Sequence, residues 1–168
     1  MNPNPFAWPF RAQYAAGFVV CAVLYAYAIY VQFALGIEPC PMCIFQRIAL
    51  IVMGIVFLVG AIHGPQARGR RAYALLLLLT ACIGVGIAAR HIWVQHQPPD
   101  LMAGCAPGWS YMVENFPQSK TLKMAFTGTA DCAQVNWTFL GLSMPLWTLV
   151  CFVLLGAGAL WAGFHRTR

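Results

Sequence analysis

Residues 39–62 read PCPMCIFQRIALIVMGIVFLVGAI, and this stretch indicates the architecture of the whole chain. From Pro41 onward it is an almost unbroken apolar run, and roughly 20 such residues in a helix cross about 30 Å of hydrocarbon. Proline suits the first turn of a helix, where its missing N–H would have had no partner. We therefore expect a transmembrane helix over residues 41–62, with a Cys-x-x-Cys motif at its start.

Three further apolar stretches are long enough to span a bilayer, and they cover residues 14–35, 72–94 and 145–164. The composition agrees, because 61% of the residues are hydrophobic and only 8% are charged. Soluble domains have about 45–50% apolar and about 25% charged residues. A chain of 168 residues cannot hide that excess in a core, so it must face lipid. The sequence predicts an all-α membrane protein, one domain over residues 1–168, built as a bundle of four transmembrane helices.

The charged residues are sorted between the loops. Arginines precede the first span, separate the second from the third and end the chain: Arg11, Arg68, Arg70, Arg71, Arg166 and Arg168. All four acidic residues fall in the other two loops. Because cytoplasmic loops carry the excess of Lys and Arg, we expect cytoplasmic termini, a short outer loop over residues 36–40 and a long one over 95–144. The net charge of +6 forms no basic stripe with interleaved aromatics, so nucleic-acid binding is not expected.

The long outer loop is exceptional in length, since loops above about 15 residues without structure of their own are uncommon unless they are functional. Its stretch from Trp109 to Phe126 mixes aromatic, apolar and charged residues. This mixture predicts a short interfacial helix lying along the membrane surface. A solvated connector is the alternative.

The seven cysteines divide according to this topology. Cys21, Cys82 and Cys151 lie inside the first, third and fourth spans, where cysteine usually acts as a small hydrophobe. The other four lie on the outer side, where disulfides form and persist. They are Cys40, Cys43, Cys105 and Cys132. One pair at the membrane surface and one in the loop can exchange through mixed disulfides, although purely structural disulfides are the alternative.

Cys43 falls in the first turn of the second span, where free N–H groups and the helix dipole favour a thiolate. Arg47 comes four residues later and therefore shares its face, about one turn deeper. A charge at this depth is unfavourable and marks a functional candidate. Its simplest role is to stabilise a thiolate or an anionic ring oxygen, and the alternative is that it snorkels to the headgroups.

A dithiol at this depth needs an electron acceptor, and a lipid-soluble quinone is a two-electron carrier that suits it. The sequence has no Gly-x-Gly-x-x-Gly fingerprint for a flavin route. His91, beside Arg90 near the outer end of the third span, is placed to hydrogen-bond a quinone oxygen or to relay its proton. The alternative is an ordinary interfacial residue at a helix end.

Other uses of a Cys-x-x-Cys motif fit less well. Covalent haem needs a histidine directly after the motif, where Ile44 stands. Cys105 and Cys132 form no second Cys-x-x-Cys, so no metal ligand set is expected, whether for zinc or for an iron–sulfur cluster. A non-catalytic metal-binding membrane protein and a protein whose disulfides only brace its loops stay open as alternatives.

Two segments resemble the DsbB family of bacterial disulfide bond formation proteins. Residues 40–47, CPMCIFQR, are similar to the family's Cys-x-x-Cys-x-x-x-Arg segment. The second segment is Asp131-Cys132 followed by WTFLGLSMPLW over residues 137–147. The resemblance covers nearly the whole chain. It implies a quinone-dependent thiol oxidase of the bacterial inner membrane, with its redox-active loops in the periplasm.

The resemblance also implies partners and roles for the cysteines. The partner would be DsbA, a periplasmic thioredoxin-fold oxidase, and the acceptor would be ubiquinone or menaquinone. Cys105 would form the mixed disulfide with reduced DsbA, and Cys132 would resolve it. Cys132 would also exchange with Cys40, while Cys43 would face the quinone as a charge-transfer thiolate.

The remaining positions match the family unevenly. Arg47 matches the quinone-proximal arginine, whereas His91 matches the family's histidine only if small insertions are allowed. Phe45 stands where an aromatic residue, often tyrosine, is usual, so a hydroxyl is absent there. A vitamin K epoxide reductase-like enzyme also joins a Cys-x-x-Cys to loop cysteines and a quinone, but its motif usually falls late in the bundle.

Overall fold

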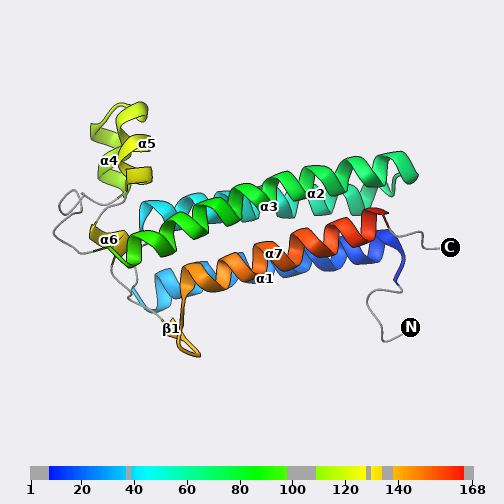
Figure 1. Cartoon of the computed structure of the whole chain (residues 1–168), viewed down its shortest axis with the longest axis horizontal. Coiled ribbons are helices and arrows are strands. Elements are labelled where there is room, and N and C mark those ends of the chain that lie inside the picture. The colour runs from blue at the N-terminus through cyan, green and yellow to red at the C-terminus, as the bar shows by residue number, and fades with distance from the viewer. Residues whose placement is uncertain (1–7, 37–38, 98–108, 128–129, 134–137, 165–168) are drawn as a thin grey trace.

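Four long helices make up most of the chain. The computed structural model describes residues 8–36, 39–97, 109–127, 130–133 and 138–164. The long helices are α1 (Phe10–Ala34), α2 (Pro41–His63), α3 (Ala67–Gln95) and α7 (Met144–Phe164). They run side by side along the long axis of the molecule (Figure 1). Each is long and apolar enough to cross a membrane, so the predicted four-helix bundle is confirmed and the chain is a multi-pass membrane protein.

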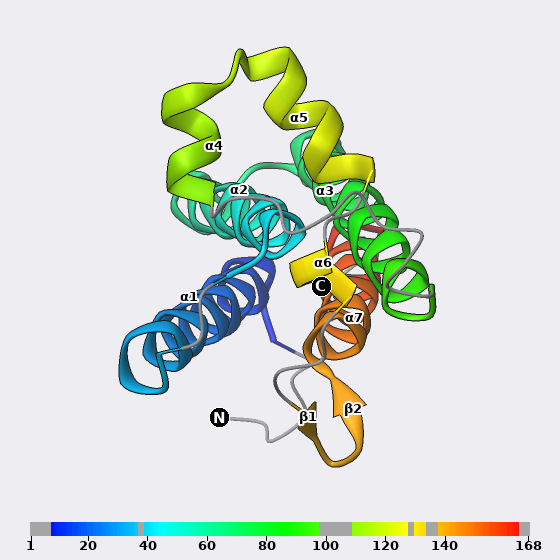
Figure 2. The same cartoon turned by 90° about the vertical axis from the view of Figure 1, so that its left-hand side faces the viewer.

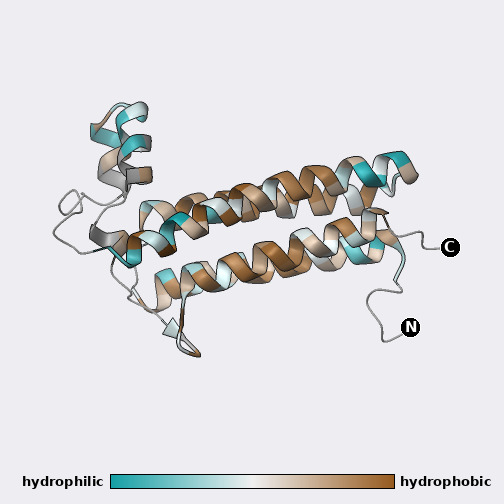
Figure 3. Ribbon diagram, viewed as in Figure 1, coloured by the Kyte–Doolittle hydropathy of each residue, from teal (hydrophilic) through white to brown (hydrophobic). Residues whose placement is uncertain are grey.

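The outer surface of the bundle is apolar along its middle (Figure 3). Val23, Leu79 and Leu154 are 62%, 60% and 65% exposed, although each lies within a long helix. Exposure of such a surface to water would be unfavourable, whereas contact with apolar lipid tails is not. The exposed faces of the helices are therefore the lipid-facing faces.

The helix ends follow from local sequence. Cys40 is the N-cap of α2, and Gly64 ends the helix in the left-handed region with φ 54°, which glycine adopts without steric conflict. α1 and α3 begin at Phe10 and Ala67, ahead of the expected starts near residues 14 and 72. Arginine is a good helix former, so the helices continue through their basic ends instead of stopping at the hydrocarbon boundary.

Glycines let the helices approach closely. A Cβ on Gly84 of α3 would lie 2.7 Å from the ring of Phe152 on α7, and a Cβ on Gly17 of α1 would lie 2.7 Å from the ring of Phe57 on α2. Small residues at such positions allow close packing between transmembrane helices, where dispersion contacts replace the hydrophobic effect. The pairs α1–α2 and α3–α7 are built in this way.

The long loop between α3 and α7 has structure of its own. It contains α4 (Trp109–Asn115), α5 (Gln118–Thr127) and α6 (Ala130–Ala133), followed by the strands β1 (Thr138–Phe139) and β2 (Leu142–Ser143). One short interfacial helix was predicted within residues 109–126, whereas this stretch forms two helices, α4 and α5, with a break at Phe116 and Pro117. Figure 2 shows α4 and α5 arching beside α2 and α3, with α6 tucked between the helix ends.

The two strands form a tight hairpin that directly precedes α7 in the chain. Thr138 pairs with Ser143 and Phe139 with Leu142. The turn places Leu140 and Gly141 at positive φ, 52° and 77°, as two-residue hairpin turns require. The Ser143 hydroxyl donates to the side-chain oxygen of Gln95 at 3.0 Å, which ties the hairpin to the end of α3.

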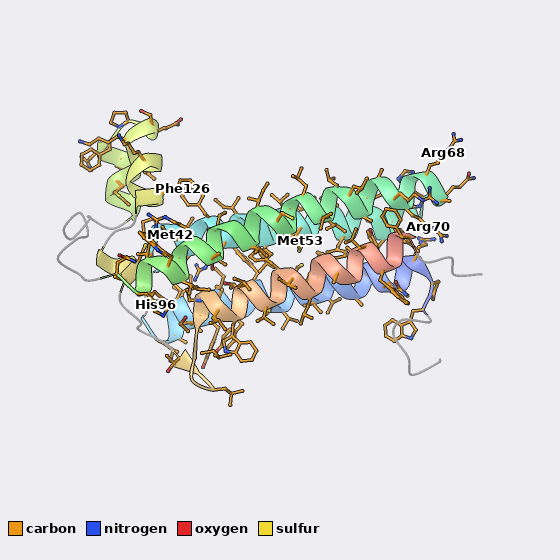
Figure 4. All side chains as sticks on the ribbon, in the orientation of Figure 1. Met42, Met53, Arg68, Arg70, His96 and Phe126 are labelled. Carbon is orange, nitrogen blue, oxygen red and sulfur yellow. The ribbon has the colours of Figure 1, made fainter. Side chains whose placement is uncertain are left out.

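The two ends of the bundle differ in chemistry. Both described ends of the chain lie at one end, where Arg68 and Arg70 also project (Figures 1 and 4). Met42 and His96 lie at the opposite end, together with the loop helices (Figure 4). The bundle therefore has a basic end and an end that carries the Cys-x-x-Cys motif.

Candidate functional site

Two cysteines occupy the start of α2. The backbone N–H of Cys43 donates to Sγ of Cys40 at 3.3 Å, so the cysteine side chain caps the helix. Pro41 follows as the first helical residue and has no N–H left to satisfy. The two Sγ atoms lie 3.0 Å apart. Ordinary helix capping thus holds the two sulfur atoms in contact.

The short helix α6 brings a third cysteine to the same place. Cys132 is fully buried and packs with Met42 of α2 and Val94 of α3. Its Sγ, Sγ of Cys40 and a ring nitrogen of His91 lie within 4.8 Å of one another. The loop therefore places the Cys132 thiol next to the Cys-x-x-Cys motif. A small movement would bring its sulfur close enough to Cys40 for thiol–disulfide exchange.

These neighbours change the acidity of Cys40, which lies just outside the membrane-spanning part of α2. Hydrogen bonding with Cys132 raises its pKa most, and hydrogen bonding with Cys43 and burial raise it further, to well above the ordinary range of a thiol. A raised pKa favours the neutral form. Cys40 therefore keeps its proton at neutral pH whenever it is a free thiol.

His91 lies between the thiols and a buried amide. Its Nε2 is 3.7 Å from Sγ of Cys40, and its Nδ1 is 3.3 Å from the amide nitrogen of Gln46. His91 is 3% exposed and Gln46 is 4% exposed, so both rely on protein groups for their hydrogen bonds. The ring is thus oriented by one nitrogen and faces sulfur with the other.

Gln46 extends this polar contact to α7. The Thr148 hydroxyl donates to the side-chain oxygen of Gln46 at 2.8 Å. A line of polar side chains therefore runs from Cys40 through His91 and Gln46 to Thr148, and it crosses α2, α3 and α7.

A cavity of about 460 Å³ opens where this line ends. Its wall comes from α1, α2 and α7 and is mostly apolar, with Leu24 and Phe152 among its residues. Few polar side chains reach it, and the ones that matter for chemistry are Cys43, Gln46, Arg47 and Thr148. His91 is not among the described residues that line it. The cavity therefore meets the cysteine motif at Cys43.

Arg47 lies in the cavity wall and is held against α1. Its guanidinium donates one hydrogen bond to the side-chain oxygen of Gln32 and another, of 2.9 Å, to the carbonyl oxygen of Ala28. These bonds hold the charge inside the bundle, one helical turn beyond Cys43. The cavity is thus bordered by a thiol and a fixed cation.

The sequence matches one family model, described as "Disulfide bond formation protein DsbB", over residues 10–162. The chain belongs to the DsbB family. Disulfide bond formation protein B of Xanthomonas campestris pv. campestris (strain 8004) is 54% identical to it, over 97% of this chain and 96% of the relative. The protein of the same name from Methylococcus capsulatus is 53% identical, over 94% and 96%. The family resemblance of the two motifs is confirmed.

The structure places most of the predicted site residues of this DsbB-family chain together. Cys40, Cys132 and His91 form one cluster with Cys43, and Arg47 lies at the cavity beside Cys43. Cys105, the remaining predicted site cysteine, lies outside the described residues.

Three polar residues of the site were not predicted from the sequence. Gln32 and Gln46 are uncharged polar residues inside apolar runs, and such residues in a span face the protein interior. A polar residue within an apolar run is therefore a signal that could have identified Gln32 and Gln46 as site residues. Thr148 gave no comparable signal, because threonine in a helix commonly bonds to its own backbone, as this one also does at 2.9 Å to Pro145.

The three cysteines within the spans have different surroundings. Cys21 is buried in the core, Cys82 is exposed on the lipid-facing surface, and Cys151 is half-buried in the cavity wall. Cys151 therefore belongs to the surroundings of the site, although the sequence suggested only a small apolar side chain.

The loop helix α5 is attached to α2 next to the motif. The ring of Phe126 stacks on that of Phe45 with centroids 5.3 Å apart, and Figure 4 shows Phe126 over the motif end of α2. Phe45 lies two residues after Cys43. Here its ring serves as a docking surface for the loop.

Proposed function

We propose that this protein reoxidises a periplasmic dithiol oxidase of the DsbA kind and passes the electron pair to a membrane quinone, so that new disulfides are made. The observation that carries the proposal is the cluster in which Cys132 of the loop meets Cys40, while Cys43, the neighbour of Cys40, reaches the cavity. The relatives' name, disulfide bond formation protein B, supports the coarser part of the proposal, that disulfides are made.

The exchange begins in the long loop. A thiolate of the reduced partner attacks a Cys105–Cys132 disulfide at Cys105, which forms a mixed disulfide and releases the Cys132 thiolate. Cys132 then attacks a Cys40–Cys43 disulfide at Cys40. This step forms a Cys40–Cys132 bond and releases the thiolate of Cys43. Each step breaks one S–S bond and forms another.

The loop pair is then restored. The second thiolate of the partner attacks the mixed disulfide and releases Cys105, so the partner leaves oxidised. Cys105 attacks the Cys40–Cys132 bond at Cys132, which reforms the loop disulfide and releases Cys40, where a proton is taken up. The net result is that two electrons move from the partner to Cys40 and Cys43.

The site favours this direction. A sulfur with a low pKa leaves a disulfide faster than one with a high pKa. The free N–H groups and dipole of the first turn of α2 stabilise negative charge at Cys43, which makes Cys43 the better leaving group of the pair. Attack by Cys132 at Cys40 therefore releases the sulfur that borders the cavity.

The cavity residues fit a quinone. Its volume of about 460 Å³ falls within the range of small-molecule sites, which are mostly apolar with a few placed polar groups. A bound quinone would accept two electrons and two protons. Arg47 would bind a ring oxygen, since a guanidinium has five N–H donors and can do so while bonded to Gln32 and Ala28. Gln46 and Thr148 would orient the ring, and the apolar wall would exclude water.

We infer an orientation in the membrane from the chemistry of the two ends of the bundle. Arg68 and Arg70 lie at the end where both described chain ends are found (Figures 1 and 4). Because positive residues stay in the cytoplasm, we place that end on the cytoplasmic side of the bacterial inner membrane. The cysteine cluster and α4–α6 then face the periplasm, where the partner would be.

The test mixes the purified protein with reduced DsbA and a soluble quinone and follows the quinone absorbance. Quinone reduction is expected with the wild-type chain and is expected to be lost in Cys43→Ser and Cys132→Ser. Cys82→Ser, which changes an exposed cysteine that is not part of the cluster, is the matched control and should retain it. Quinone reduction that persists without Cys43 and Cys132 would sink the proposal.

A further inference from the structure

The cysteine cluster has the composition of a metal site. Sγ of Cys40, Sγ of Cys132 and a ring nitrogen of His91 lie within 4.8 Å of one another, and Sγ of Cys43 lies 3.0 Å from Sγ of Cys40. Thiolates and imidazoles are the ligands that zinc takes in proteins. We infer that the reduced protein binds Zn²⁺ at this cluster, through Cys40, Cys132 and His91, with Cys43 as the fourth ligand.

The distances are close to those of a tetrahedral site. Zn–S bonds of about 2.3 Å and Zn–N bonds of about 2.0–2.1 Å hold a sulfur and a nitrogen about 3.6 Å apart. Nε2 of His91 is already 3.7 Å from Sγ of Cys40. The same bond lengths separate two sulfur atoms by about 3.8 Å, so Cys43 and Cys40, now at 3.0 Å, need to part by less than one bond length. Side-chain rotation is enough for this change.

The surroundings would support a bound cation. Nδ1 of His91 faces the side chain of Gln46, so the ring is already oriented through its second nitrogen. In metal sites, residues behind the ligands commonly orient a ligating histidine in this way. Met42 and Val94 pack against Cys132 and exclude water from one side of the cluster. Both features, the partial exclusion of water and the oriented imidazole, would favour metal binding.

Binding would depend on the redox state. Zn²⁺ needs deprotonated sulfur, so it would displace one proton from each cysteine ligand, with no transfer of electrons. A disulfide between any two of these cysteines removes ligands. Zn²⁺ would therefore select the dithiol form and hold its sulfur atoms away from exchange, which makes the site a reversible block on the reduced protein.

The test is a Zn²⁺ titration of the full chain in detergent, without partner or quinone. The chain is reduced, freed of reductant under anaerobic conditions and titrated against a chromogenic chelator. One Zn²⁺ per reduced chain is expected, and none at that affinity for the oxidised chain, which has the same sequence and so controls for folding. Co²⁺ in place of Zn²⁺ should show the thiolate-to-cobalt charge-transfer absorption that only sulfur ligands give.

Variants identify the ligands. Cys132→Ser and His91→Ala should each weaken Zn²⁺ binding by at least tenfold, and Cys82→Ser should leave it unchanged. Equal Zn²⁺ binding by oxidised and reduced chains, or by Cys132→Ser and the wild type, would overturn the inference. Because neither DsbA nor quinone is present, such a result would leave the proposed function standing, and failure of the quinone assay would leave the zinc site standing.

Discussion

The side-chain amide of Gln46 bonds on both sides: its nitrogen lies 3.3 Å from Nδ1 of His91, and its oxygen accepts a 2.8 Å hydrogen bond from Thr148. One residue of α2 thus links α3 to α7 beside the cysteine cluster. Since Gln46 and His91 are buried, no water replaces these bonds easily when one partner is lost.

The first prediction is that Gln46→Leu destabilises the bundle. His91 and Thr148 would each lose a partner, and a buried polar group left unsatisfied costs about 1–3 kcal/mol. Denaturant unfolding of the purified protein in detergent measures the loss. Gln118→Leu, at an exposed position of α5, is the control and should change the free energy of unfolding little. Equal effects of the two substitutions would contradict the role given to Gln46.

The second prediction separates the cavity from the loop cysteines. Arg47→Ala should raise the KM for quinone by roughly tenfold or more, because a hydrogen bond to a charged group contributes about 1.5–3 kcal/mol and about 1.4 kcal/mol is a factor of ten. Exchange between reduced DsbA and the loop pair, followed by trapping the mixed disulfide, should be unchanged. Arg68→Ala, at the basic end, should affect neither. Equal loss of both steps in Arg47→Ala would mean that Arg47 is only structural.

The third prediction concerns helix packing. Gly84→Ala should destabilise the protein by about 1–3 kcal/mol, because the new Cβ would lie 2.7 Å from the Phe152 ring. Gly86→Ala is a matched control two residues along the same helix, where a Cβ meets nothing within 4 Å. Its stability should stay the same or rise slightly through helix propensity. A similar change in melting temperature for both variants would refute the close α3–α7 contact.

The fourth prediction concerns the attachment of α5. Phe126→Ala removes the ring that stacks on Phe45, so the backbone of residues 118–127 should exchange its amide hydrogens faster. Hydrogen exchange with mass spectrometry measures this, and α3 serves as the internal reference. Val113→Ala, at an exposed position of α4, should leave the exchange of α5 unchanged. Unaltered protection of α5 in Phe126→Ala would show that the aromatic pair does not hold it.

The fifth prediction is a pH dependence. The folded protein raises the pKa of Cys40, mainly through Cys132, so it holds that proton more tightly than the unfolded chain does. The resulting stabilisation is complete below the ordinary cysteine pKa of about 8.5 and is lost as the pH rises through the higher folded value.

Unfolding of the reduced protein across the alkaline range tests this. Stability should fall with rising pH in the wild type and in Cys82→Ala, and the fall should be shallower in Cys132→Ala, which lacks the main cause of the shift. The same slope in all three proteins would rule out Cys132 as that cause.

The sequence by itself determined the bundle. Four apolar runs of sufficient length predict four spans, because an unpaired backbone in lipid is so unfavourable that such runs must be helical. The start of α2 was predictable for the same local reason, since Pro41 and the Cys-x-x-Cys motif fall where a helix begins. Arg47 could be placed one turn from Cys43 by helical periodicity alone.

Only the tertiary structure decided which distant residues meet. Cys132 and His91 come from α6 and α3, and nothing in the spacing of the sequence places either beside Cys40 at the start of α2. The quinone contact suggested for His91 stays a prediction, and only the structure puts its ring against sulfur and the Gln46 amide. Periodicity reports which face of one helix is apolar, but the rotation and depth at which helices pack depend on interdigitating side chains such as Phe152 against Gly84. Those contacts set the cavity and the sulfur cluster, and they exist only once the helices are assembled.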